Sequence, residues 1–174
     1  MGFRERVLQD WAANAARPES QLILAWFRLA QWASVRWGRL ARLVVTPYWL
    51  TCSMVFGVEL PASAQVGPRL RLYHPHGIVV SPHCTLGSDC HLRHNVTVGN
   101  RVDRDGNEVG VATLGDHVEL GAGCAVIGDL HVGDHTRVGA LAVVVKSVPA
   151  WSVVVGNPGR VIRVDEPTAV QEPE

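Results

Sequence analysis

The chain has 174 residues, of which 47% are hydrophobic, and its 16 basic residues balance its 16 acidic ones. A formal net charge of zero gives no basis for a nucleic-acid partner, and the length suits one domain with an appendage. The first residues lack an apolar signal segment, and the longest uncharged stretch, Leu43 to Val58, is too short to cross a membrane, so we expect a cytoplasmic protein.

Residues 1–57 predict an N-terminal helical segment with seven arginines and three acidic residues. Its first part, residues 1–18, predicts a short helix or arm that stops near Pro18. The stretch from Gln21 to Gly38 predicts an amphipathic helix, with Arg28 toward another face, because apolar residues recur in it at helical spacing. These apolar residues are Leu22, Trp26, Leu29, Ala33 and Trp37.

A second helix is predicted from Pro47 to Phe56, with Pro47 in its first turn and Thr46 as its cap. Tryptophan and arginine on an amphipathic helix are compatible with peripheral contact with a membrane surface. We favour packing on the end of the next domain or on a partner subunit, because a solenoid needs a cap over its first coil.

Residues 58–155 repeat with a period of six, most clearly from residue 114 to residue 148. Aliphatic side chains fill the first position of each hexad, glycine recurs in the second, and small residues fill the fifth. The first positions are Leu114, Leu120, Val126, Val132, Val138 and Val144. Such a period is typical of a parallel β-helix, an all-β solenoid in which three hexads close one triangular coil. We expect the first-position side chains to stack inside, about 4.8 Å apart.

The period is already present from Leu60 to Ile78 and resumes at Val80 after a slip of two residues. Residues 99–110 break it and are rich in Gly, Asn and Asp, which predicts an excursion loop. A last strand is expected at Val153–Val155. Residues 156–174 form a predicted C-terminal tail, and we expect residues 165–174 to be disordered.

The chain has four cysteines, and none belongs to a CxxC pair. They are Cys52, Cys84, Cys90 and Cys124. Three of them occupy fifth positions of hexads, so we expect small buried core residues rather than metal ligands or disulfides. That use of cysteine indicates a reducing compartment.

Two of the eight histidines, His74 and His94, fall at one corner of the predicted coil, one coil apart. His76 lies nearby. These three imidazoles could hold a metal ion, although no carboxylate or cysteine completes the set. Alternatively, His74 could act as a general base, with its tautomer fixed by a carboxylate such as Glu59, fifteen residues earlier.

Several motifs resemble the serine acetyltransferases of the hexapeptide-repeat, left-handed β-helix class, and most of all its shorter members found with exopolysaccharide genes. The motifs are FGVELP at 56–61, LYHPHGIVV at 72–80, VTVG at 96–99, LGAG at 120–123 and GNPGR at 156–160. The helical sequence AWFRLAQW at 25–32 also resembles the last helices before the family's β-helix.

The resemblance implies a left-handed β-helix that forms homotrimers and binds acetyl-CoA in the groove between neighbouring chains, with no metal expected. The family's catalytic histidine falls on His74, and its carboxylate partner on Glu59, where serine acetyltransferases typically have Asp. Expected coenzyme contacts are Gly99, Ala122, Arg137, Ala140, Lys146 and Arg160. Expected acceptor contacts are Tyr73, His76 and His94.

Two positions depart from the pattern of the serine-specific members. Tyr73 stands where they have Asp, and Gly110-Val111 stands where they carry an Arg-His pair. We expect acetyl transfer from acetyl-CoA to the hydroxyl of L-serine or a small serine-like acceptor. Alternatives are a saccharide acceptor in exopolysaccharide biosynthesis, a non-catalytic β-helix scaffold, and a metal-dependent β-helix enzyme of the carbonic anhydrase type.

Overall fold

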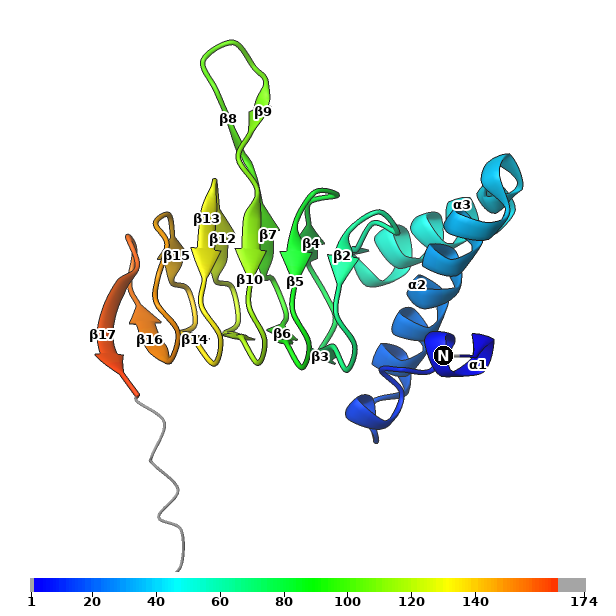
Figure 1. Cartoon of the computed structure of the whole chain (residues 1–174), viewed down its shortest axis with the longest axis horizontal. Coiled ribbons are helices and arrows are strands. Elements are labelled where there is room, and N and C mark those ends of the chain that lie inside the picture. Colours follow the sequence, from blue (N-terminus) through cyan, green and yellow to red (C-terminus); the bar gives the residue numbers. More distant parts are fainter. Residues whose placement is uncertain (1, 166–174) are drawn as a thin grey trace, which may run out of the picture.

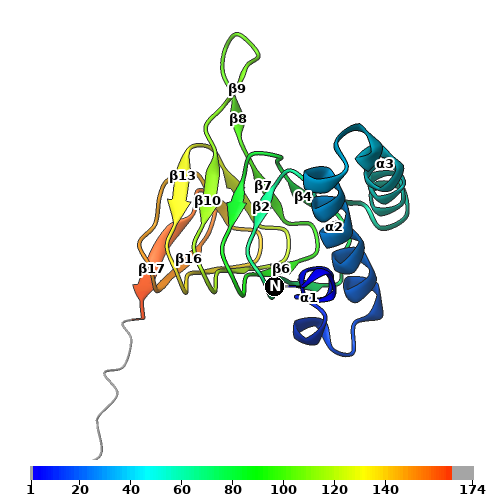
Figure 2. The same ribbon diagram turned by 45° about the vertical axis from the view of Figure 1, so that its right-hand side comes forward.

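A computed structural model describes residues 2–165, so nine of the ten C-terminal residues predicted to be disordered, 166–174, lie outside the described part. A helical N-terminal segment sits at one end of a β-solenoid, and an antiparallel hairpin projects from the solenoid's side (Figure 1). The turned view in Figure 2 shows the coils closing around a triangular interior.

Three sheets form the solenoid's sides, because each coil contributes one strand to each side, and all their strands are parallel except the last strand of sheet C. Sheet A contains β1 (Val58–Glu59), β4 (Ile78–Val80), β7 (Thr97–Gly99), β12 (Ala125–Ile127) and β15 (Val143–Val144). Sheet B contains β2 (Gln65–Val66), β5 (Thr85–Leu86), β10 (Ala112–Leu114) and β13 (Leu130–Val132). Sheet C contains β3 (Arg71–Tyr73), β6 (His91–Arg93), β11 (Glu119–Leu120), β14 (Arg137–Val138), β16 (Ser152–Val155) and β17 (Arg160–Val164).

The interior is built as the hexad pattern predicts. All six first-position side chains from Leu114 to Val144 are buried, and each stacks on the equivalent residue one coil away, as in the pairing of Val126 with Val98 and Val144. All four cysteines are buried and free, which confirms their prediction as small core residues.

The end of the solenoid confirms one prediction and adds a strand that the period does not indicate. β16 covers the predicted strand and pairs in parallel with β14. β17 then returns antiparallel to β16, within residues expected to form a tail. A single antiparallel return has no hexad period, so the repeat pattern carries no signal for it.

The N-terminal segment contains six helical elements. They are α1 (Phe3–Val7), the 3₁₀ helix η1 (Ala12–Asn14), α2 (Pro18–Arg36), the 3₁₀ helix η2 (Gly38–Ala41), α3 (Arg42–Thr51) and the π-helical turn η3 (Cys52–Phe56). Pro18 opens α2 at its first turn, where its missing N–H costs nothing.

The buried face of α2 differs from the predicted stripe. Ile23, Phe27 and Ala30 face the core, whereas Leu22 and Trp37 are 62% and 43% exposed. Both sets recur at helical spacing, so the period alone does not decide which of them faces inward.

The second predicted helix was placed too late in the sequence. α3 begins at Arg42, and both Thr46 and Pro47 lie inside it, so Thr46 is not a cap. The proline removes one helical hydrogen bond. Packing offsets this loss, because the adjacent Tyr48 is buried and its hydroxyl donates to the Leu60 carbonyl at 2.7 Å.

A buried ion pair fixes the helices on the first coil, which confirms the predicted cap. The Arg28 Nε donates to Asp10 at 2.7 Å, and both side chains are almost fully buried. Arg28 also donates to the carbonyls of Val66 and Gly67, while Asp10 accepts from the Leu70 N–H. Arg28 was expected on a face of the helix away from the apolar stripe, and the structure shows that this face is buried and that Arg28 joins the cap to the coil.

The excursion predicted at residues 99–110 is a hairpin of β8 (Arg101–Val102) and β9 (Glu108–Val109). It leaves the solenoid after β7 and returns at β10, at the corner between sheets A and B (Figure 1). None of the helices within residues 2–165 is long and apolar enough to cross a membrane.

Candidate active site

The corner where sheet C passes into sheet A collects most of the predicted site residues. Its successive turns begin at His74, His94, Ala122 and Ala140. Backbone hydrogen bonds join them: Asn95 N–H to the His76 carbonyl at 2.8 Å, Gly123 N–H to that of His94 at 3.0 Å, and Leu141 N–H to that of Ala122 at 2.9 Å. Four of the residues predicted for the site, His74, His94, Ala122 and Ala140, therefore form one column along the solenoid.

His74 lies on an enlarged turn of this column. Leu72 pairs with Leu92 and Val80 with Val98, so eight residues on one coil match six on the next. The two-residue slip seen in the sequence is thus an insertion between β3 and β4. His74 is exposed and has a left-handed φ of 53°, an unusual conformation for a residue with a side chain.

The structure brings His74 and His94 together as the repeat predicts. Their ring centroids are 6.2 Å apart, and the rings are nearly perpendicular at 74°. The His94 Nδ1 is buried and has no hydrogen-bond partner within residues 2–165. His76 is exposed on the enlarged turn. Across the part of the chain that the structure describes, no three His, Cys, Asp or Glu side chains converge as a metal site would require.

Glu59 lies on β1, the first strand of sheet A, and pairs with Val79 on the adjacent strand β4. Its side chain is exposed, and it forms neither a hydrogen bond nor an ion pair with His74. The carboxylate–imidazole contact predicted from the fifteen-residue spacing is therefore not made within one chain.

A groove of about 420 Å³ lies on the outer face of sheet C beside the histidine corner. Gly121 and Gly139 directly follow β11 and β14 and line the groove where the next coil approaches closely, since a Cβ on Gly121 would lie only 2.6 Å from the Ala140 backbone nitrogen. Three of the predicted coenzyme residues, Ala122, Arg137 and Ala140, line this groove together with Tyr73.

The other three predicted coenzyme residues lie elsewhere. Gly99 ends β7, and Lys146 follows β15. Both therefore lie at the edge of sheet A opposite the His74 corner, on the side of the excursion hairpin. Arg160 begins β17 at the C-terminal end of the solenoid, and its side chain is exposed.

Two relatives show what this architecture is similar to. The serine acetyltransferase of Mycobacterium tuberculosis is 38% identical over 141 residues, which cover 81% of this chain and 59% of that protein. The Escherichia coli K12 protein WcaB, named as a colanic acid biosynthesis acetyltransferase, is 33% identical over 162 residues, which cover 89% of this chain and 98% of that protein. The chain belongs to the serine acetyltransferase-like family of hexapeptide-repeat acyltransferases. No protein-family model matches it.

Solved structures support the family's fold. The Neisseria gonorrhoeae serine acetyltransferase superposes with a TM-score of 0.78 and 26% identity, over 95% of this chain and 66% of that one. A serine acetyltransferase in complex with CoA superposes with a TM-score of 0.73 at 21% identity, which shows the fold alone. This agreement confirms the left-handed β-helix expected from the sequence motifs. The chain spans about 59% of the length of the M. tuberculosis relative.

Two arginines pack against the ring of Tyr73, the residue that precedes the candidate base, and bring positive charge to this part of the site. The Arg17 guanidinium lies 4.2 Å from the centroid of the Tyr73 ring, and that of Arg93 lies 5.1 Å from it. Neither arginine forms an ion pair within residues 2–165. Neither arginine was among the residues predicted for the site. Arg93 could have been found, because the repeat places it one coil after Tyr73, whereas Arg17 reaches the site only through the packing of the helices.

His91 shares the groove and is biased toward its neutral form. Burial lowers the pKa of His91, and the positive charge of Arg71 lowers it further. The Glu119 carboxylate, 3.7 Å from the His91 Nδ1, opposes this shift only in part. The positive charge at this end of the groove therefore comes from the arginines.

Proposed function

We propose that this protein is an acetyl-CoA-dependent O-acetyltransferase in which His74 is the general base. The observation that carries the proposal is the column of turns at this corner. The exposed His74 imidazole lies at one end of the column, and the groove runs beside the turns at Ala122 and Ala140. Family membership supports the same reaction class.

In this reaction the His74 imidazole takes the proton of the acceptor hydroxyl. The acceptor oxygen attacks the thioester carbonyl, and the carbon–sulfur bond breaks as the tetrahedral intermediate collapses. The leaving CoA thiolate takes up the proton held by the imidazole. Much of the acceleration comes from holding both substrates at one corner, which makes the attack effectively intramolecular.

Acetyl-CoA would extend from His74 along the groove past Ala122 and Ala140, with Arg137 near a phosphate group. We propose a homotrimer in which a neighbouring chain completes this groove. Gly99 and Lys146 lie at the edge of sheet A that does not carry His74, so they would contact the coenzyme bound at a neighbour's corner. Arg160, at the C-terminal end, would meet the phosphates farthest from the thioester.

We propose that Glu59 orients His74, although the two side chains are not in contact within one chain. A carboxylate that hydrogen-bonds an imidazole selects its tautomer and stabilises the imidazolium formed during proton transfer. Assembly or substrate binding would have to close this contact. Glu59→Gln keeps the shape and removes the charge, and it should lower kcat at least tenfold without changing the KM for acetyl-CoA.

Two acceptors fit the reaction. The name of the M. tuberculosis relative points to L-serine. The site favours the second acceptor, a saccharide. A zwitterionic amino acid requires charged partners for both its groups. Here Tyr73, Arg17 and Arg93 stand beside the base, with no carboxylate in place of Tyr73 to receive an ammonium group.

Thiol release from acetyl-CoA tests the reaction and separates the acceptors. The protein should release CoA with a saccharide such as glucuronate, and the Arg93→Gln variant should show a higher KM for that sugar. Rapid turnover with free L-serine would assign the serine activity instead. Purified trimer that binds acetyl-CoA but releases no thiol with either acceptor would support the non-catalytic scaffold.

A further inference from the structure

The turn between α2 and α3 exposes an unusual amount of apolar surface. We call residues 35–43 the hairpin tip; it lies at the outer end of the helical cap (Figure 1). Val35 is 90% exposed, Leu43 74%, Leu40 65% and Trp37 43%. Large apolar side chains exposed this close together are typical of a contact surface rather than of a solvated turn.

The same turn is strongly basic. Arginines 36, 39 and 42 alternate with its apolar residues, and all three are exposed. Residues 20–58 contain four arginines and no lysine, aspartate or glutamate. Arg28, the fourth arginine, is neutralised by Asp10. The three arginines of the tip have no acidic residue near them in the sequence to neutralise their charge.

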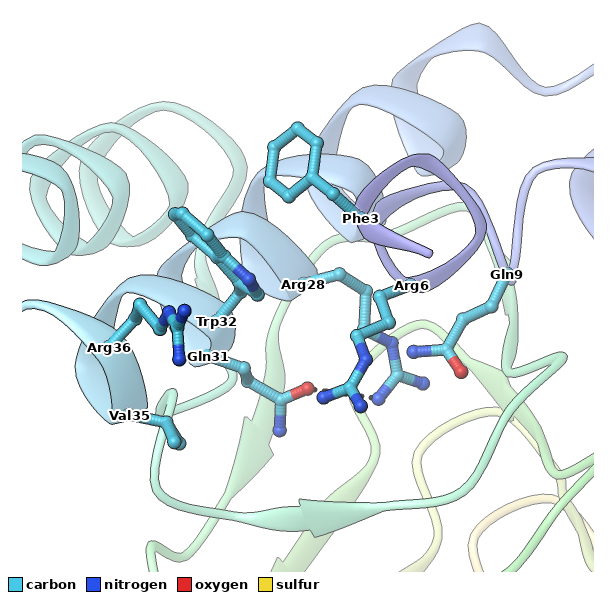
Figure 3. Close-up of a pocket in the computed structure, with 8 residues that line it drawn as sticks. All are labelled: Phe3, Arg6, Gln9, Arg28, Gln31, Trp32, Val35 and Arg36. Atoms are coloured by element: carbon cyan, nitrogen blue, oxygen red, sulfur yellow. Dashed lines mark hydrogen bonds between the residues drawn. The ribbon is translucent and has the colours of Figure 1, made fainter. Parts of the chain in front are cut away.

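A pocket of about 630 Å³ adjoins the tip between α1 and α2. Figure 3 shows the ends of Arg6 and Gln9 directed toward the hydrogen-bonded pair of Arg28 and Gln31. Trp32 lies on one side of the pocket, and Val35 and Arg36 connect it to the tip. Neither Arg6 nor Arg36 forms an ion pair in the described part of the chain. The pocket thus offers guanidinium and amide donors with an aromatic wall.

We propose that the hairpin tip binds the anionic surface of a phospholipid membrane, with a lipid phosphate in the adjoining pocket. The apolar side chains of the tip would enter the boundary between headgroups and acyl chains, as those of interfacial helices do. Arg39 and Arg42 would lie at the headgroup level, and Arg6 and Arg36 would hold the phosphate. The proposal does not depend on the catalytic role of His74.

Charge distinguishes a membrane from a second copy of the chain as the occupant. If two copies met through the same surface, their tip arginines would face each other, and like charges in contact oppose association. An anionic bilayer provides the opposite charge and an apolar interior together, which matches the composition of the tip.

Sedimentation of the full-length protein with lipid vesicles tests the proposal. Binding should be clear with vesicles of phosphatidylcholine and phosphatidylglycerol, weak with phosphatidylcholine alone, and reduced by added salt. Each arginine removed from the tip, as in Arg39→Gln, should lower the partition coefficient about fivefold. The double variant Leu40→Ser/Leu43→Ser should abolish binding.

Two exposed residues far from the tip provide matched controls. Ile162→Ser changes a side chain as exposed as Leu40, at 64% against 65%, and Arg104→Gln removes an exposed charge from the excursion hairpin. Both should bind vesicles as the unaltered protein does. Arg6→Gln should weaken binding to anionic vesicles. Adding inorganic phosphate should not restore vesicle binding to this variant, and phosphate should not take the place of the vesicle as the ligand of the unaltered protein.

Equal binding to both kinds of vesicle, or none to either, would overturn the proposal. It would also be overturned if Leu40→Ser/Leu43→Ser bound vesicles normally. Light scattering adds a decisive readout: if this double variant lowers the molar mass of the assembly, the tip is a contact between subunits and not a membrane surface. The tip variants should transfer acetyl groups to soluble acceptors at the unaltered rate. A failure of the membrane proposal can therefore be told apart from a failure of the proposed reaction.

Discussion

The rings of His74 and His94 lie one coil apart at the same corner, with their centroids 6.2 Å apart. His74 is exposed, whereas the Nδ1 of His94 is buried without a partner. A bound acceptor could provide that partner. His94→Ala should therefore raise the KM for the acceptor about three- to tenfold, the value of one hydrogen bond, and leave the KM for acetyl-CoA unchanged. Initial rates at varied concentrations of each substrate measure this, and a change confined to acetyl-CoA would count against the assignment.

Filling the groove should impair coenzyme binding selectively. Ala140→Phe puts a ring where the groove passes the corner, so the KM for acetyl-CoA should rise at least tenfold while the fold is kept. Ala150→Phe is the matched control, because Ala150 precedes the left-handed residue Trp151 just as Ala140 precedes Leu141, but at another corner. Equal effects of the two changes on KM would show that the groove is not the coenzyme site.

Loss of the buried ion pair should destabilise the cap strongly. Asp10→Ala leaves the Arg28 charge buried without a counter-ion, so we expect a loss of about 3–5 kcal/mol in the free energy of unfolding. Urea unfolding measures it. A loss under 1 kcal/mol would mean that the cap contributes little to the stability of the first coil.

The solvent-accessible pair of Arg69 and Asp89 provides the contrast, and Arg69→Ala should cost far less stability than Asp10→Ala because water screens the charge of the exposed Arg69. The hydrogen bond from Arg69 lowers the pKa of Asp89. A carboxyl with a lowered pKa in the folded state stabilises the protein above its unfolded pKa, and this contribution disappears as the pH falls through the folded value. The difference in stability between Arg69→Ala and the unaltered protein should therefore shrink in acid, and a difference that grew would contradict the assignment.

The four thiols should be unreactive in the folded protein. Burial raises the pKa of Cys52 to about 11 and those of Cys90 and Cys124 to about 12, and it also raises the pKa of Cys84. The thiolate is the reactive form, so raising the pH toward 9 should accelerate modification far less than for an ordinary exposed cysteine. A thiol reagent should label all four residues only after unfolding. Fast labelling of the native protein would show that one of them is accessible.

The period of six was sufficient to predict the coils, because a stacked solenoid repeats one local rule. It placed the first-position residues inside and set His74 over His94. It also revealed a two-residue slip but placed it after Ile78, whereas the pairings of Tyr73 with Arg93 and of Val79 with Thr97 put the two extra residues in the enlarged turn that begins at His74.

The features that the sequence did not predict depend on packing between distant segments. The buried face of α2 was chosen by contact with the first coil, which selected Phe27 over Leu22. Arg17 meets Tyr73 only because that cap is in place. The contact between Glu59 and His74 shows the reverse case: spacing suggested it, but neither a hydrogen bond nor an ion pair joins the two side chains in the structure.

The rate of CoA thiol release by His74→Ala, compared with that of His83→Ala, tests the central claim most directly. His83 is also an exposed histidine of a solenoid turn, but it lies away from the corner column. Removing a general base should lower kcat by about 100- to 10,000-fold, while His83→Ala should match the unaltered protein and both variants should bind acetyl-CoA normally. Unchanged turnover in His74→Ala would contradict the account.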